Sequence, residues 1–177
     1  MTKRWIKNGV FADMTMEING RMVSNPTDEM LRMAGYEPYV PSEKELLAQA
    51  KDAKTQEIEA YDTSTSVNGF NLGGKQMWLS FDERARIRQS INAYHSEGRT
   101  EMTKWFNGKA FTFTLDTWQT MLNKLSVYAS EALNVTERHK AEVRALTSIE
   151  AVEGYDYKTG YPEKLSFDNT SDAVITK

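Results

Sequence analysis

The side chains in this sequence that are best suited to catalysis or metal binding are two histidines, His95 and His139. Each falls on the polar face of a predicted helix, with a glutamate close by, Glu97 and Glu142 respectively. A structural or catalytic zinc site needs three or four ligands at a defined spacing. The chain has no cysteine, and no third ligand is visible near either histidine. We therefore expect two surface histidines and no metal site.

Paired carboxylates are the other arrangement that could do chemistry. A glycosidase needs two of them roughly 5–10 Å apart in a cleft, and the sequence offers Asp156 with Glu163, or Asp62 with Asp82. Acidic residues at helix starts, such as Asp116, are already explained by helix capping and the helix dipole. Nucleophile elbows, P-loops and dinucleotide-binding glycine motifs are missing from the sequence. We expect no enzymatic activity and no cofactor, and keep a glycan- or peptidoglycan-acting enzyme as a remote alternative.

A glycine pair followed by lysine, Gly73-Gly74-Lys75, could suggest a phosphate cradle, but it belongs to an internal duplication. At an offset of 34 residues, Gly74-Lys75 falls on Gly108-Lys109. The other identities are Asp82 with Asp116, Tyr94 with Tyr128, and Ser96-Glu97 with Ser130-Glu131. The shared positions are turn glycines, strand alternations and helix caps. They predict two copies of a hairpin followed by a helix, at 67–98 and 103–133.

The composition is that of an ordinary globular chain of 177 residues, with 40% hydrophobic residues and a net charge of −3. This length predicts about one domain, or one domain with a small appendage. No stretch approaches the roughly 20 apolar residues of a membrane span. The mildly acidic balance also argues against nucleic-acid binding, which depends on clustered lysine and arginine.

The predicted fold class is α+β, beginning with a small β-rich module at residues 1–41. Asn8-Gly9 and Asn19-Gly20 are hairpin turn signals, because both residue types tolerate positive φ. They separate expected strands at about 3–7, 10–18 and 21–24. A short helix at 26–34 should follow, capped by Asn25 and stopped by Gly35, with Tyr36 completing a Schellman motif.

A connecting helix is predicted at 42–61, opened by a capping box at Ser42 and Glu45. Its apolar stripe is thin and rich in alanine, and includes Leu47, Ala50 and Ile58. Such a helix is marginal alone and should pack against another surface. That surface could be its own domain or a second subunit. In the second case, changing these three residues to glutamate should give a monomer whose repeats stay folded.

The C-terminal domain is predicted at 62–167, with the two hairpins forming one antiparallel sheet of about four strands packed on the helices. A break at Asn134-Val135 should separate the second repeat from a further helix at 135–152. The aromatic segment, defined as residues 154–167, lacks helical period and should cross back over the domain as an extended clamp or strand. Residues 168–177 should be loose.

Several aromatic residues are candidates for partner binding. Trp78 and Trp118 are expected in the core, whereas Trp105 and Phe106 must face opposite sides of one strand, which leaves one of them for a protein contact. The aromatic segment could dock on a neighbour in the same way. The candidate partner-binding residues are Leu47, Ala50, Ile58, Trp105, Tyr155, Tyr157, Tyr161 and Phe167.

Two parts of the chain carry a resemblance to phage proteins. Asn25-Pro26-Thr27-Asp28-Glu29, with Leu31 and Ala34-Gly35-Tyr36, resembles an N-terminal element of small proteins encoded among phage and prophage tail genes. The second part combines Ala60-Tyr61-Asp62-Thr63-Ser64, Val67-Asn68-Gly69-Phe70, Trp78-Leu79, Asn134-Val135-Thr136, Glu150-Ala151-Val152 and the stretch from Tyr155-Asp156-Tyr157 to Leu165-Ser166-Phe167. It is similar to a family of phage and prophage proteins of unassigned function, common in viruses of gut Bacteroidales.

This resemblance implies a non-enzymatic, tail-associated structural or adaptor protein of the virion tail, baseplate or tail fibre. It carries no catalytic residues to transfer. It implies other tail or tail-fibre proteins as partners, several copies of this chain in the assembly, and a location in the virion or, during assembly, in the host cytoplasm. A tail-fibre assembly chaperone that leaves before maturation stays open as the alternative.

Overall fold

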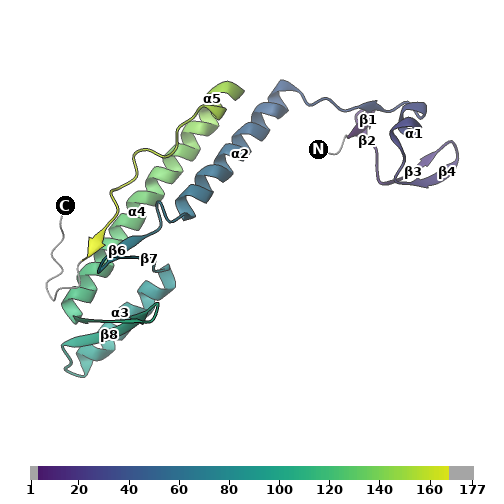
Figure 1. Ribbon diagram of the computed structural model, residues 1–177. Coiled ribbons are helices and arrows are strands. Elements are labelled where there is room, and N and C mark those ends of the chain that lie inside the picture. The colour runs from purple at the N-terminus through teal and green to yellow at the C-terminus, as the bar shows by residue number, and fades with distance from the viewer. Residues whose placement is uncertain (1–3, 168–177) are drawn as a thin grey trace. The chain divides into compact units, whose positions relative to one another are not determined.

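The computed structural model describes residues 4–167, which form two compact units that meet between Ala48 and Gln49. The mixture of helices with several small sheets confirms the predicted α+β class (Figure 1). The predicted loose segment at 168–177 lies outside the described residues.

Six short elements make up most of the N-terminal unit. They are β1 Trp5–Lys7, β2 Val10–Phe11, β3 Thr15–Ile18, β4 Arg21–Ser24, α1 Asp28–Met33 and β5 Glu37–Pro38. Both Asn-Gly turns adopt positive φ, at 50° and 81° for Asn8-Gly9 and at 52° and 76° for Asn19-Gly20. The two predicted hairpins are thereby confirmed, as β1–β2 and β3–β4. The expected strand at 10–18 is in fact two strands, because residues 12–14 leave the ladder.

The start of α1 differs from the prediction and its end agrees. Asn25 has φ of 50° and does not cap the helix. Thr27 does, since its side chain accepts a hydrogen bond from the Met30 backbone at 3.3 Å. At the other end, the amides of Gly35 and Tyr36 donate to the carbonyls of Arg32 and Leu31, at 3.0 and 2.9 Å. This is the predicted Schellman motif.

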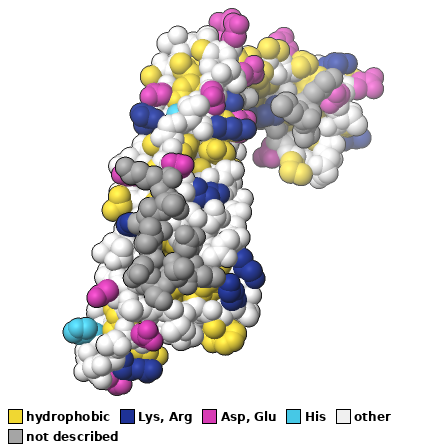
Figure 2. All heavy atoms as spheres, turned by 60° about the vertical axis from the view of Figure 1, so that its left-hand side comes forward, with side chains coloured by type: hydrophobic (Ala, Val, Ile, Leu, Met, Phe, Trp, Pro, Cys, Tyr) yellow, Lys and Arg dark blue, Asp and Glu magenta, His cyan; other side chains and the backbone are white. Residues whose placement is uncertain are grey.

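The N-terminal unit has a very small core. Among its described residues only Trp5, Ile18 and Leu31 are buried hydrophobics, and the Trp5 indole donates to the Asp28 carboxylate at 3.1 Å. Its exposed large hydrophobic residues are Val10, Phe11, Met14, Met22, Met30, Met33, Val40 and Leu46. Figure 2 shows hydrophobic side chains lying among charged ones on the surface of this unit. A folded unit of this size therefore leaves most of its large apolar side chains in water.

Helix α2, Glu43–Thr63, opens with the predicted capping box. The Ser42 amide donates to the Glu45 carboxylate at 2.8 Å, and the Glu45 amide donates back to Ser42 Oγ at 3.3 Å. Tyr39 donates its hydroxyl hydrogen to the same carboxylate. These hydrogen bonds, that from Tyr39 first, lower the pKa of Glu45 to about 2. The start of α2, up to Ala48, belongs to the N-terminal unit, and the helix from Gln49 onward belongs to the second unit.

The second unit contains the two predicted hairpin–helix repeats. Its remaining elements are β6 Phe70–Leu72, β7 Lys75–Met77, α3 Phe81–Ser96, β8 Glu101–Phe106, β9 Lys109–Thr114, α4 Leu115–Ala145, α5 Ile149–Glu153 and β10 Ser166–Phe167. The prediction of one four-stranded sheet was wrong. β6 pairs with β7 on one side and with β10 on the other, so the second hairpin forms a separate two-stranded sheet, β8–β9.

The side chains of both hairpins nevertheless enter one hydrophobic core. Met77 and Leu79 are buried like their repeat counterparts Phe111 and Phe113, and Trp118 is 1% exposed, as predicted. The Trp118 indole donates to the Met102 carbonyl at 2.8 Å. The members of this core are Phe70, Leu72, Met77, Leu79, Ile87, Ile91, Met102, Phe111, Phe113, Leu115, Trp118, Met121, Leu122, Leu125 and Phe167. Trp78 was wrongly predicted in the core: it lies between two inward-facing residues, points outward by alternation and is 56% exposed.

The predicted break at Asn134-Val135 does not occur, because α4 runs unbroken from Leu115 to Ala145. Asn134 is exposed in mid-helix, where asparagine costs only a few tenths of a kcal/mol, about 0.7 at most. The buried stripe continues past it through Ala132, Thr136, His139 and Val143. The helix predicted at 135–152 is therefore the last part of α4, a short connection, and α5, which Ser148 caps.

Candidate functional site

Helices α2 and α4 lie side by side and antiparallel in the second unit (Figure 1). Lys140 of α4 forms an ion pair with Glu59 of α2 at 2.9 Å, and near the other end Lys51 Nζ donates to the Arg144 carbonyl at 2.7 Å. Ile58 is fully buried. The apolar stripe of α2 is thus covered at Ile58 by its own domain. Of the two surfaces predicted to cover this helix, its own domain or a second subunit, the structure shows the first at this position. Ala50 is partly buried in the same unit, and Leu47 is partly buried in the N-terminal unit.

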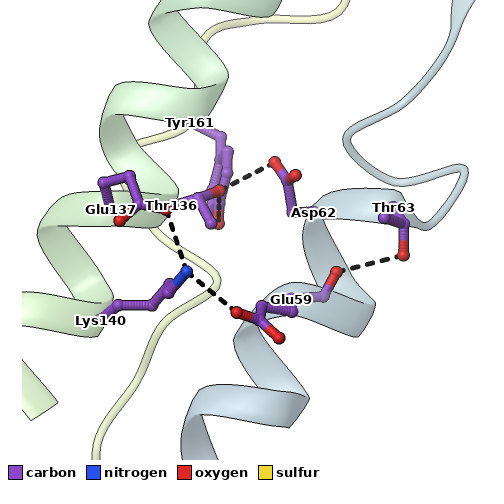
Figure 3. Close-up of polar contacts among 7 residues, drawn as sticks. All are labelled: Glu59, Asp62, Thr63, Thr136, Glu137, Lys140 and Tyr161. Atoms are coloured by element: carbon purple, nitrogen blue, oxygen red, sulfur yellow. Dashed lines mark hydrogen bonds and ion pairs between the residues drawn. The ribbon is translucent and has the colours of Figure 1, made fainter. Parts of the chain in front are cut away.

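A polar network joins α2, α4 and the aromatic segment (Figure 3). Thr136, which is 2% exposed, donates its hydroxyl hydrogen to Asp62 at 2.8 Å, and the Tyr161 hydroxyl lies 2.9 Å from the same Thr136 oxygen. Since Thr136 has only one hydrogen to give, Tyr161 is the donor to Thr136. Beside these hydrogen bonds, the Lys140 ammonium forms ion pairs with both Glu59 and Glu137. The network therefore holds three segments together that are far apart in the sequence.

His139 was wrongly predicted on the surface, since it is 3% exposed and contacts the aromatic segment. Its Nε2 lies 2.9 Å from the Thr159 carbonyl, which can only accept, so Nε2 carries a hydrogen. Its Nδ1 lies 2.6 Å from the Tyr155 hydroxyl, which also contacts the Glu142 carboxylate. The Tyr155 hydroxyl therefore links the buried His139 ring to the Glu142 carboxylate of the same helix.

The aromatic segment crosses back over its own domain, as predicted, and ends in β10, which pairs in parallel with β6. Tyr61 of α2 makes edge contacts with Tyr157 and Tyr161, with ring centroids 5.7 and 5.5 Å apart. Phe167 is 1% exposed and packs against Phe70 in the core. Phe167 is therefore a core residue of this chain, in correction of its proposed place in a partner contact. The three tyrosines of the segment are partly buried against α2 and α4.

The structure gives the candidate carboxylates local partners. Asp62 accepts from Thr136, and Asp156 accepts from the Lys158 backbone at 3.0 Å within a turn. Glu163 borders a hollow between α4 and the aromatic segment, whose other lining includes Val127 and Leu165. Within residues 4–167, no group of three histidine, cysteine or acidic side chains is close enough to hold a metal ion. His95 is exposed, as predicted.

We expect the contact between Tyr155 and Glu142 to make the protein less stable at alkaline pH. Burial, and then the hydrogen bond to Glu142, raise the pKa of Tyr155 to about 12 from an ordinary value of 10. The folded state thus holds this proton while the unfolded state loses it, so the contribution of Tyr155 to stability is constant below pH 10 and is lost between pH 10 and 12. Urea unfolding across this range should show the fall. A Tyr155→Phe variant should show a smaller one, and parallel curves for the two proteins would contradict the assignment.

The repeats expose large aromatic side chains. Trp105 is 70% exposed, whereas its neighbour Phe106 turns inward, with its ring 6.1 Å from that of Trp118. This confirms that the two face opposite sides. Trp105 stands on the outer face of the β8–β9 hairpin, whose other outward residues include Thr103, Ala110 and Thr112. On the first repeat, Phe81 is 76% exposed at the start of α3.

A second exposed feature is the α3–α4 groove, defined by Phe81, Arg84, Ala85, Arg88, Gln89, Asn92 and Ser126. Its volume is about 330 Å³. A smaller hollow of about 90 Å³ adjoins it at Arg84 and is lined on its other side by Trp78, Leu125 and Tyr128. Sequence reasoning missed this groove, because Arg84 and Arg88 belong to no motif that indicates a binding site. The available signal was the repeat itself, which aligns them with Trp118 and Leu122.

The fold defines an α+β protein in which two hairpin–helix repeats share one hydrophobic core, and α4 of the second repeat also lies antiparallel to α2. In the described part of the chain, no helix combines the length and the apolar character needed to cross a membrane. The chain belongs to the family described as "Domain of unknown function (DUF4376)", whose model matches residues 49–159. The match begins where the second unit begins and takes in both repeats and most of the α2–α4 network. No significant match to a curated protein or to a solved structure was found.

Proposed function

We propose that this chain is a non-enzymatic structural or adaptor protein of a phage tail, baseplate or tail fibre, present in several copies and acting through protein–protein contacts. The phage setting rests on the sequence resemblance described above. The mode of action rests on the surface. The observation that supports it best is the N-terminal unit, which buries three large hydrophobics and exposes many more.

A unit with so small a core is marginal by itself. Domains of this size usually need disulfides, a metal or association with a partner to reach useful stability. The chain has no cysteine, and the exposed residues are flexible or branched apolar side chains such as Met22, Met33 and Val40. Methionine adapts its shape to a partner surface and is common at such contacts. Covering this surface in an assembly would remove apolar area from water and stabilise the unit.

Mass spectrometry of purified particles tests the proposal. A tail component should be present at a fixed small multiple of another tail protein of known copy number. If the protein is abundant in the lysate but missing from the particle, it is the assembly chaperone that leaves before maturation. If it is missing from the particle and binds no tail or fibre protein during infection, the proposed function is wrong.

We also predict that Met22→Lys together with Met33→Lys reduces incorporation into particles at least tenfold without lowering the stability of the free protein. Both side chains are at least 70% exposed, so the free protein loses little, whereas burial of one such side chain at an interface is worth roughly 1.5–3 kcal/mol. The measurement is copy number per particle when the variant complements a phage lacking the gene. Leu133→Lys, at an exposed hydrophobic of the second unit, is the control. Equal incorporation of both variants would argue against the N-terminal surface.

A further inference from the structure

The two repeats differ at the helix positions that face the core. In α4 these positions hold Trp118 and Leu122, which are buried in the core. The equivalent positions of α3 hold Arg84 and Arg88. Two cations therefore stand where the other copy has its largest core contacts, and they lie across the packed surface between α3 and α4.

Both arginines are held in place by neutral groups. Arg84 Nη1 donates to the Leu125 carbonyl at 3.1 Å. Arg88 Nη2 contacts the Leu122 carbonyl at 3.2 Å, Asn123 Oδ1 at 3.3 Å and Ser126 Oγ at 3.0 Å. These contacts fix the position of the guanidinium groups without neutralising their charge.

No carboxylate within residues 4–167 forms an ion pair with either arginine. Burial, and then the neighbouring charge of Arg88, lower the pKa of Arg84. The buried Nε atoms of both residues have no hydrogen-bond partner among residues 4–167. The other terminal nitrogens, Arg84 Nη2 and Arg88 Nη1, make no hydrogen bond to a described residue, and both arginines line the groove. Two fixed positive charges thus face the groove without a matching negative charge.

We propose that the α3–α4 groove binds an acidic segment of a partner protein, whose carboxylate contacts Arg84 and Arg88 while a neighbouring apolar side chain covers Phe81. This inference rests on the proposed function and names the chemistry of the partner. The positive charge of the arginines favours binding of an anion, and a guanidinium group can donate two parallel hydrogen bonds to a carboxylate. The exposed Phe81 ring and Ala85 call for an apolar neighbour of that anion. A peptide that alternates acidic and apolar residues offers both, whereas a bare phosphate offers only charge.

The test uses the full chain labelled with ¹⁵N and a synthetic probe peptide, acetyl-Gly-Leu-Asp-Phe-Glu-Gly-amide. We expect saturable shifts of the Arg84 and Arg88 Nε–H signals and of the Trp78 indole signal. The matched peptide with asparagine and glutamine in place of the two acids should bind at least about tenfold more weakly, because it removes the charge-assisted hydrogen bonds. This comparison needs no protein variant, so it stays informative if an arginine variant fails to fold.

Variants localise the site. Arg88→Gln and Phe81→Ala should each weaken binding of the acidic peptide several-fold, whereas Arg86→Gln, on the exposed face of the same helix, should leave it unchanged. Shifts that spare Arg84, Arg88 and Trp78, equal binding of the amide peptide, or tighter binding of a short oligonucleotide would each overturn the proposal. Because the test does not involve particles, failure to bind leaves the tail assignment to be judged by copy number. Absence from particles likewise leaves peptide binding as a separate result.

Discussion

Replacing Ile58 with glutamate is expected to unfold the second unit or to lower its free energy of unfolding by at least about 3–5 kcal/mol. Ile58 is fully buried on α2, in the domain that also buries Val143 and Val152. A carboxylate there would lose its hydration, while the isoleucine packing is lost as well. The measurement is urea unfolding at neutral pH, followed by circular dichroism.

Ala53→Glu is the matched control, because Ala53 is exposed in the middle of the same helix and receives the same new side chain. It should change the free energy of unfolding by no more than about 0.5 kcal/mol. Equal effects of the two variants would mean that the face of α2 with Ile58 is not packed as described. The result also bears on self-association. A triple change of Leu47, Ala50 and Ile58 to glutamate no longer tests for a monomer, because it should unfold the domain first.

Trp118→Ala should be of similar severity, costing about 3–5 kcal/mol. The side chain is 1% exposed and packs against Phe106 and Phe113, so its removal leaves a large cavity at the centre of the core. It also leaves the Met102 carbonyl without the indole donor at 2.8 Å. The free energy of unfolding of most domains is only about 5–15 kcal/mol, so we expect partial unfolding of the variant near 37 °C in a thermal melt.

Trp105→Ala separates this effect from the general loss of a tryptophan. Trp105 belongs to the same repeat but is 70% exposed, so its removal should change stability by about 0.5 kcal/mol or less. If Trp105 contacts a partner, the same variant should lower incorporation into particles. A loss of stability equal to that of Trp118→Ala would show that the hairpin has its other face in the core.

Local signals in the sequence predicted much of the fold. Asn-Gly pairs give hairpins because both residues accept positive φ, and both N-terminal turns formed where the dipeptides stand. The capping box at Ser42 and the Schellman motif at Gly35 rest on hydrogen bonds within a few residues, so the sequence contains all their partners. One error of this kind was a shift of the α1 cap from Asn25 to Thr27.

The predictions failed where a position depends on packing between distant segments. Asn134 resembles a helix cap, but the stripe through Thr136 and Val143 keeps the helix intact because its burial outweighs a small propensity cost. His139 lies on this stripe, three residues after Thr136, so the periodicity of one continuous helix would have predicted that it is buried. We missed this because the predicted break at Asn134 divided the helix and interrupted the periodicity.

The candidate site could be predicted only in part. Trp105 was identified correctly as one of an opposed pair with Phe106, because strand alternation is a local rule. The same rule would have placed Trp78 outside. The covering of Ile58 and Phe167 by the same chain depends on which distant segments meet, and a single sequence does not contain that information.

The parallel pairing of β10 with β6 has a consequence for how the protein is made. Phe167 completes a core whose other members begin at Phe70. During synthesis, both hairpins and α3 leave the ribosome long before this last strand, with one side of β6 still unpaired. Contacts between segments so far apart in sequence form slowly, and unpaired strand edges in nascent chains invite aggregation. The second unit can therefore complete its core only after residue 167 has been synthesised and has left the ribosome.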